Sequence, residues 1–125
     1  MIEPPRLFVY GTLQPGRLRW SFLEPFATGF RPATVGGRLC DSGKGWPAAV
    51  FGAGGDRIPG TTVDLDPGRT DEALRLLDGV EGSVDGLFVR IAVVTDADER
   101  AWAYQWGRSL DGLTRIDRWD RTAEA

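Results

Sequence analysis

The stretch FVYGTLQPG, residues 8–16, carries the clearest structural signal in this 125-residue chain. Residues 7–10 are apolar, β-branched or aromatic, which is typical of a buried strand. The run stops at Gly11, where a turn can direct successive backbone N–H groups into a cavity and bind a carboxylate or an oxyanion. A turn of this kind often does no more than reverse the chain. The candidate binding residues are Tyr10, Gly11, Thr12 and Leu13.

Five further stretches have the composition of strands, and two of them form a hairpin. The polar turn at residues 96–100 joins the last two, and Gly60 predicts a bulge within one of the others. Beyond Gly107 the chain is expected to pack over the edge of a sheet. The five stretches are Val35–Cys40, Trp46–Phe51, Ile58–Leu65, Leu87–Thr95 and Ala101–Trp106.

The clearest helix is expected from Thr70 to Gly79. Thr70 suits the N-cap, two acidic residues follow it in the first turn, and Gly79 suits the end. A second, short helical stretch is expected within residues 18–26. The predicted fold class is therefore α+β, with a mainly antiparallel, barrel-like sheet. The apolar face of the main helix would consist of Ala73, Leu74, Leu76 and Leu77.

Composition narrows the class of protein. With 42% hydrophobic and 26% charged residues, residues 1–125 are expected to form one globular domain. An acidic isoelectric point of about 4.9 disfavours nucleic-acid binding. No apolar stretch is long enough for a membrane span and the N-terminus lacks the pattern of a signal peptide, so a cytoplasmic location is expected. The single cysteine, Cys40, is expected to be a small buried side chain.

The chain has no histidine, so imidazole bases, Ser-His-Asp triads and His-based zinc sites are excluded. Proton transfer then falls to carboxylates, tyrosine or Lys44. Glu81 stands out among the glutamates because it follows an apolar helix and precedes a strand that should be buried. Partial desolvation there would raise the pKa of its carboxyl towards the range useful for proton transfer. The alternative is a loop carboxylate that accepts hydrogen bonds from backbone N–H groups.

These motifs together resemble the γ-glutamylcyclotransferase superfamily, in its AIG2-like and γ-glutamylamine cyclotransferase branch. The resemblance covers residues 7–106 and consists of short motifs in a fixed order. They are FVYGTLQPG at 8–16, GRL at 37–39, WPA at 46–48, LDGVEG at 77–82 and FVR at 88–90.

The resemblance implies a small β-barrel with flanking helices that releases 5-oxoproline from a γ-glutamyl compound, with no metal or organic cofactor. It assigns the general base and acid to Glu81. It also implies that the turn over residues 10–13 holds the substrate's α-carboxylate through backbone N–H groups. The chain departs from the family pattern at Phe88, where a tyrosine is usual, and at residues 17–20, where Asn or His is common.

Several side chains near these motifs have two interpretations. The Tyr10 ring lines the cavity or fills the core. Arg90 shares a strand face with Phe88, and it either pairs with Glu81 or Asp78 or, as the pattern favours, is solvated. Tyr104 is expected to pack in the core. Trp46 is expected in a cavity wall or an apolar seam.

Two other functions remain open from the sequence. The same fold occurs attached to allophanate hydrolases, where it handles a small carboxylated urea. The second is a non-catalytic domain that binds a small anion. The absence of a tyrosine hydroxyl at Phe88 is compatible with this hypothesis. Segments 17–24 and 41–46 are expected to select the leaving amine, whose identity the sequence leaves open together with the oligomeric state.

Overall fold

The computed structural model describes residues 4–52, 56–82 and 87–119. Its strands are β1 (Arg6–Val9), β2 (Ala27–Asp41), β3 (Pro47–Phe51), β4 (Arg57–Leu65), β5 (Phe88–Val94), β6 (Arg100–Trp106) and β7 (Thr114–Arg115). Its helices are α1 (Trp20–Leu23) and α2 (Thr70–Gly82), with 3-10 turns η1 (Glu24–Phe26) and η2 (Pro67–Arg69). The short helix expected within residues 18–26 is thus confirmed as α1 followed by η1.

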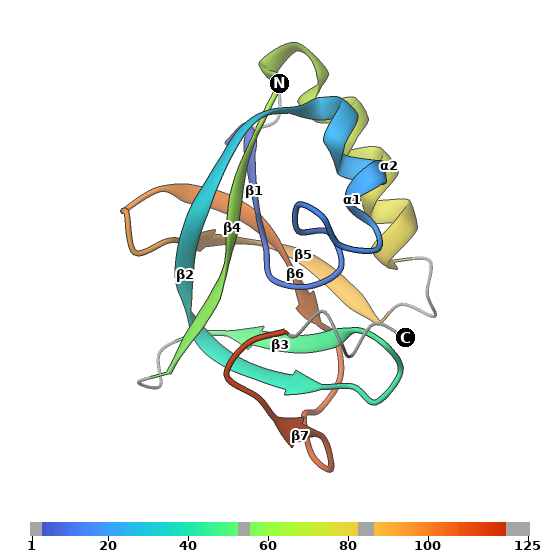
Figure 1. The fold of residues 1–125 in the computed structure, drawn as a ribbon, viewed down its shortest axis with the longest axis vertical. Helices are drawn as coiled ribbons and strands as arrows, with labels where there is room; N and C mark the ends of the chain where they lie inside the picture. Colours follow the sequence, from blue (N-terminus) through green and yellow to red (C-terminus); the bar gives the residue numbers. More distant parts are fainter. Residues whose placement is uncertain (1–3, 53–55, 83–86, 120–125) are drawn as a thin grey trace.

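The strands form one curved sheet in the order β3-β2-β4-β1-β6-β5, with β7 added beside β2. Every pairing is antiparallel except that of β1 with β6. The sheet curls into a nearly closed barrel, and α1 and α2 lie together on one flank (Figure 1). The predicted α+β class with a mainly antiparallel barrel is confirmed, as is the packing of the tail over an edge, by β7.

β3, at one end of the sheet, approaches β6, the strand next to the other end, through a side-chain hydrogen bond. The backbone N–H of Phe51 in β3 donates to Oε1 of Gln105 in β6, at 3.0 Å. We call this junction of β3 and β6 the seam. It differs from the other strand boundaries because a side chain replaces the backbone ladder.

β2 is much longer than the strand predicted at residues 35–40. It begins at Ala27 and pairs with β4 over its first ten residues, before β3 takes over from Gly37. Pro32 hid this extension, because proline removes a ladder donor. Among the described strands β4 is the only partner of this part of β2. The strand therefore needs ladder donors on one side only, which is why a proline is tolerated within it.

Gly60 does not form the predicted bulge. Its pairing with Ala33 lies within a continuous register, and the irregularity in this ladder falls between Ala27 and Gly29. A Cβ atom at Gly60 would lie 2.4 Å from the backbone oxygen of Val9. The glycine therefore permits the close approach of β4 to β1 rather than a change of register.

α2 continues to Gly82, three residues past the predicted end at Gly79. Thr70 is its first residue rather than its cap: its hydroxyl donates to the carbonyl of Asp66, whose side chain accepts from the N–H of Gly68. Leu76 is also 43% exposed and lies off the apolar face. The apolar residues of this helix that are fully buried against β1 and β4 are Ala73, Leu74 and Leu77.

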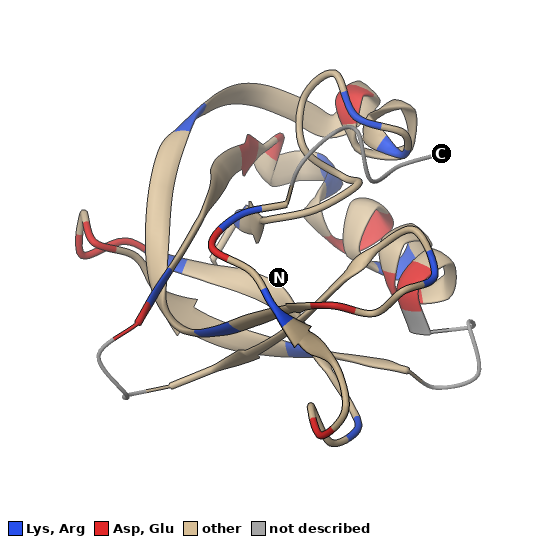
Figure 2. Ribbon diagram, turned by 60° about the horizontal axis from the view of Figure 1, so that its bottom comes forward, with Lys and Arg blue, Asp and Glu red and all other residues tan. Residues whose placement is uncertain are grey.

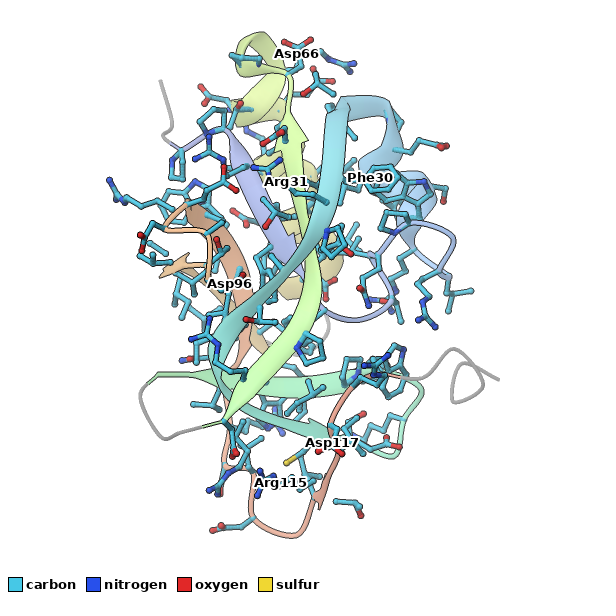
Figure 3. All side chains as sticks on the ribbon, turned by 60° about the vertical axis from the view of Figure 1, so that its left-hand side comes forward. Phe30, Arg31, Asp66, Asp96, Arg115 and Asp117 are labelled. Carbon is cyan, nitrogen blue, oxygen red and sulfur yellow. The ribbon has the colours of Figure 1, made fainter. Side chains whose placement is uncertain are left out.

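Charged residues of both signs are scattered over the strands, helices and turns (Figure 2). The most connected cation is Arg31 of β2 (Figure 3), whose guanidinium contacts Asp64 at 2.7 Å and Glu99 at 2.6 Å. The hydrogen bond from Arg31, with the positive charges of Arg31 and Arg6, holds the pKa of the Asp64 carboxyl below its usual range. Cys40 is buried, as expected. None of the helices in the described part of the chain has the length and hydropathy needed to cross a membrane.

Candidate active site

All six predicted site residues line one cavity: Tyr10, Gly11, Thr12, Leu13, Glu81 and Phe88. The space between its walls, open mouth included, is about 350 Å³. Its walls come from β1 and the following turn, the start of β3, the end of α2, and strands β5 and β6. The lining residues are Phe8, Val9, Tyr10, Gly11, Thr12, Leu13, Trp46, Pro47, Glu81, Phe88 and Tyr104.

The turn after β1 is held by its own backbone. The N–H of Gln14 donates to the carbonyl of Gly11 at 3.1 Å, and the N–H of Arg19 donates to the carbonyl of Thr12 at 2.7 Å. A Cβ atom at Gly11 would lie 2.6 Å from Cγ of Pro47. Glycine is therefore required here, because the turn packs directly on the start of β3.

Glu81 lies in the last turn of α2 and not in a loop. It follows Leu74 and Leu77 at helical spacing, so it lies on the buried face of the helix. Glu81 is 7% exposed and is the one charged residue among those lining the cavity. Burial raises the pKa of its carboxyl, and the positive charge of Arg19 partly opposes that rise. A raised pKa is the direction expected of a carboxyl that takes up and returns a proton during a reaction.

Tyr10 both lines the cavity and packs in the core. Its hydroxyl donates to the backbone carbonyl of Tyr104, which ties β1 to β6. Burial, with the negative charge of Glu81, raises the pKa of this hydroxyl well above its usual value. The group is therefore neutral, and its proton is engaged in the fold.

Asp78, one turn before Glu81, anchors the end of α2. It accepts a hydrogen bond from the Tyr104 hydroxyl at 2.7 Å and two from the Arg90 guanidinium at 2.9 and 3.2 Å. That guanidinium stacks 4.5 Å from the centre of the Trp102 ring. The prediction of a solvated Arg90 is wrong: the Asp78 carboxylate and the Trp102 face retain it. Tyr104 is buried as expected, and its ring also lines the cavity.

Aromatic rings close two sides of the cavity. Phe88 is half-buried, with its ring centre 5.4 Å from that of Trp106 in an edge-on contact. Trp46 lies in the wall, as the sequence predicts. Its carbonyl accepts a hydrogen bond from the Ser42 hydroxyl at 2.6 Å, so the loop before β3 is closed on itself.

Sequence reasoning did not single out Arg19 as a functional residue. Its Nη1 atom lies 3.8 Å from Oε2 of Glu81, and a quarter of its side chain is exposed. The sequence did carry one signal for Arg19. Residues 17–20 depart from the family pattern, because this segment contains arginine where Asn or His is common.

The arrangement combines one buried carboxyl with a backbone turn inside an apolar cavity. Such a carboxyl can accept a proton and return it, because burial brings its two protonation states closer in free energy. Among the described residues, no three His, Cys, Asp or Glu side chains lie close enough together to hold a metal ion.

The chain matches known proteins over nearly its whole length. A family model described as gamma-glutamyl cyclotransferase, AIG2-like, matches residues 7–121. The gamma-L-glutamyl-butirosin B gamma-glutamyl cyclotransferase of Niallia circulans is 27% identical over 123 residues, covering 92% of this chain and 75% of that protein.

Solved structures share the fold. A protein from Pyrococcus horikoshii superimposes with a TM-score of 0.67 at 23% identity, over 91% of this chain and 86% of its own. YkqA from Bacillus subtilis gives 0.70 at 23% identity, over 92% and 39%. The allophanate hydrolase of Kluyveromyces lactis gives 0.65 at 15% identity, over 92% and 20%. At these identities the likeness concerns the fold alone.

Proposed function

We propose that this chain, which belongs to the AIG2-like gamma-glutamyl cyclotransferase family, cyclises the γ-glutamyl group of a γ-glutamyl amine or amino acid to 5-oxoproline and releases the free amine. The observation that carries this proposal is the buried carboxyl of Glu81 in the cavity beside the turn over residues 10–13.

The reaction needs little chemistry from the protein. A γ-glutamyl group carries its own nucleophile, the α-amine, which closes a five-membered ring on the γ-carbonyl carbon. Holding the chain bent makes the attack intramolecular, for which effective molarities reach about 10⁵–10⁸ M. A small, largely apolar cavity is suited to holding that bent conformation.

Glu81 supplies the proton transfer. The α-amine arrives as an ammonium group, gives one proton to the Glu81 carboxylate and attacks the γ-carbonyl carbon. The departing nitrogen receives that proton from Glu81 as its bond to carbon breaks. A second proton passes in the same way from the ring nitrogen to the released amine, so the amine leaves as an ammonium ion and Glu81 is regenerated. General acid–base catalysis of this kind contributes about 10²–10⁴-fold.

The turn and the aromatic rings hold the substrate in this scheme. Backbone N–H groups of Gly11, Thr12 and Leu13 bind the α-carboxylate, since a fixed set of amide dipoles suits an anion. The rings of Tyr10 and Phe88 contact the methylene groups. Because the Tyr10 hydroxyl donates to the carbonyl of Tyr104, the Tyr10 ring is held in place for that contact.

The test is an assay for 5-oxoproline with a panel of γ-glutamyl amines, γ-glutamyl amino acids and glutathione. We expect product from the wild-type protein with at least one substrate, and a loss of at least about 10²-fold in kcat for Glu81→Gln. Glu72→Gln is the matched control, because Glu72 is on the same helix but exposed and paired with Arg69. It should retain wild-type activity.

Three results would contradict the proposal. Full activity in Glu81→Gln would remove Glu81 from the reaction. Binding of a small carboxylate without turnover of any panel member would favour an anion-binding domain instead, and turnover of a carboxylated urea alone would favour the activity of the allophanate-hydrolase type.

A further inference from the structure

The position of Arg19 is determined by the backbone of the candidate site. Its N–H donates to the carbonyl of Thr12 at 2.7 Å, and its carbonyl accepts from the N–H of Phe22 at 3.1 Å. Arg19 is thereby fixed between the turn after β1 and the start of α1. Its side chain reaches the end of α2, where Nη1 lies 3.8 Å from Oε2 of Glu81.

The guanidinium has donors to spare. At 3.8 Å the contact with Glu81 is an ion pair without a hydrogen bond. Within the described residues no hydrogen bond from the Arg19 side chain is found. A guanidinium carries five N–H donors in a planar fork that matches a carboxylate. Since a quarter of the side chain is exposed, an incoming anion can reach it.

The proposed reaction brings the leaving group to the same place. Glu81 exchanges protons with both the α-amine and the departing nitrogen, so that nitrogen lies within hydrogen-bond reach of the Glu81 carboxyl. Its substituent therefore lies beside Glu81 as well. When the leaving amine is an α-amino acid, its carboxylate is attached one carbon away from that nitrogen, which places it in the neighbourhood of Arg19.

We propose that Arg19 determines specificity by binding a carboxylate on the leaving amine, so that the protein prefers γ-glutamyl amino acids to γ-glutamyl compounds with a neutral or cationic amine. This inference rests on the proposed cyclotransferase function. The substrate's own α-carboxylate is assigned to the backbone amides of residues 11–13, which leaves the guanidinium for the second anion. A cationic amine at this place would be repelled by Arg19.

The experiment uses three substrates of similar size and different charge on the leaving group: γ-glutamylglycine, γ-glutamylglycinamide and γ-glutamyl-1,2-diaminoethane. For each, kcat/KM of Arg19→Met is divided by that of the wild type. This ratio cancels differences in the intrinsic reactivity of the amines. Any effect of Arg19 on the pKa of Glu81 shifts all three ratios in the same direction.

We expect the ratio for γ-glutamylglycine to be about ten-fold lower than that for the glycinamide, the size expected for one charge-assisted hydrogen bond at a partly exposed site. The ratio for the diaminoethane compound should be the highest. Arg19→Lys, which keeps the charge without the fork, should lie between wild type and Arg19→Met. Arg38→Met, an exposed arginine on β2, is the control and should leave all three ratios near one.

The outcomes separate the two proposals. Equal loss with all three substrates would mean that Arg19 acts on the α-carboxylate or through Glu81, and would overturn this inference alone. Unchanged ratios would do the same. Absence of 5-oxoproline from the wild-type protein with every γ-glutamyl compound would instead overturn the proposed function and this inference with it.

Discussion

At the scale of single residues, the buried carboxyl of Glu81 has a cost in stability. Burial raises its pKa in the folded protein above that in the unfolded chain. A group of this kind favours the folded state below its unfolded pKa, and that contribution is lost as the pH rises through the folded pKa. At neutral pH the ionised form therefore destabilises the fold.

We predict that Glu81→Gln raises the melting temperature at pH 7 by about a few degrees, because the variant has no buried charge. The gain should disappear near pH 4, where the glutamate itself is protonated. Thermal unfolding at both pH values measures this. Glu72→Gln, in which the exposed ion pair with Arg69 is lost, should show no gain at pH 7. An equal gain at both pH values would mean that charge is not the cause.

Gly11 offers a second prediction at this scale. In Gly11→Ala the new methyl group would overlap the Pro47 ring, and we expect a loss of about 1–3 kcal/mol in the free energy of unfolding. Pro47→Ala in the same chain should restore part of that loss, since it removes the ring. Urea denaturation of the two single variants and the double variant tests the coupling. Strict additivity would show that the two residues do not clash.

At the scale of elements, the end of α2 decides where the candidate base lies. Asp78 holds this end against β5 and β6 through Arg90 and Tyr104. We predict that Asp78→Asn lowers kcat about ten-fold and leaves KM nearly unchanged, because Glu81 loses its fixed position while the turn over residues 10–13 is intact. Amide hydrogen exchange at residues 80–82 should quicken.

The matched control for this prediction is Glu72→Gln, on the same helix but in its first turn, exposed and paired with Arg69. It should change neither kcat nor the exchange rates at residues 80–82. A rise in KM with unchanged kcat in Asp78→Asn would show that Asp78 serves substrate binding instead of the placement of Glu81.

The elements also show which parts of the structure can be predicted from the sequence. Strand β1, the β5–β6 hairpin and the core of α2 follow from local pattern. The last turn of α2 does not, because Gly79 resembles a helix end while its exposed position allows the helix to continue. The first part of β2 is hidden by Pro32, and the Asp78–Arg90 pair depends on a contact between distant segments. Local pattern carries no signal for such pairings.

At the scale of the whole molecule, Arg31 joins three separate segments of the barrel: β2, β4 and the β5–β6 turn. Arg31→Met should lower the free energy of unfolding at pH 7 by about 1 kcal/mol, as the pairs are partly exposed. The pKa of Asp64 is lowered in the fold, so this contribution is present above its unfolded pKa and is lost as the pH falls through the folded one.

Denaturation of wild type and Arg31→Met at pH 7 and pH 2.5 measures that dependence, with 1 M salt as a further arm. We expect the difference between the two proteins to shrink both in acid and in salt. A difference that persists in both conditions would assign the effect to packing of the arginine stem.

The seam gives the barrel a preferred place to part. Separating β2 from β4 breaks a ladder that spans Ala27 to Gly36, whereas β3 and β6 are joined by the hydrogen bond from Phe51 to the Gln105 side chain. Trp46 and Pro47 stand on one side of this junction, and Phe88 and Tyr104 on the other. Parting β3 from β6 breaks apolar packing and this hydrogen bond but no backbone ladder among the described residues. We therefore expect the barrel to open first at this junction, which would widen the cavity for a ligand while every helix and ladder stays folded.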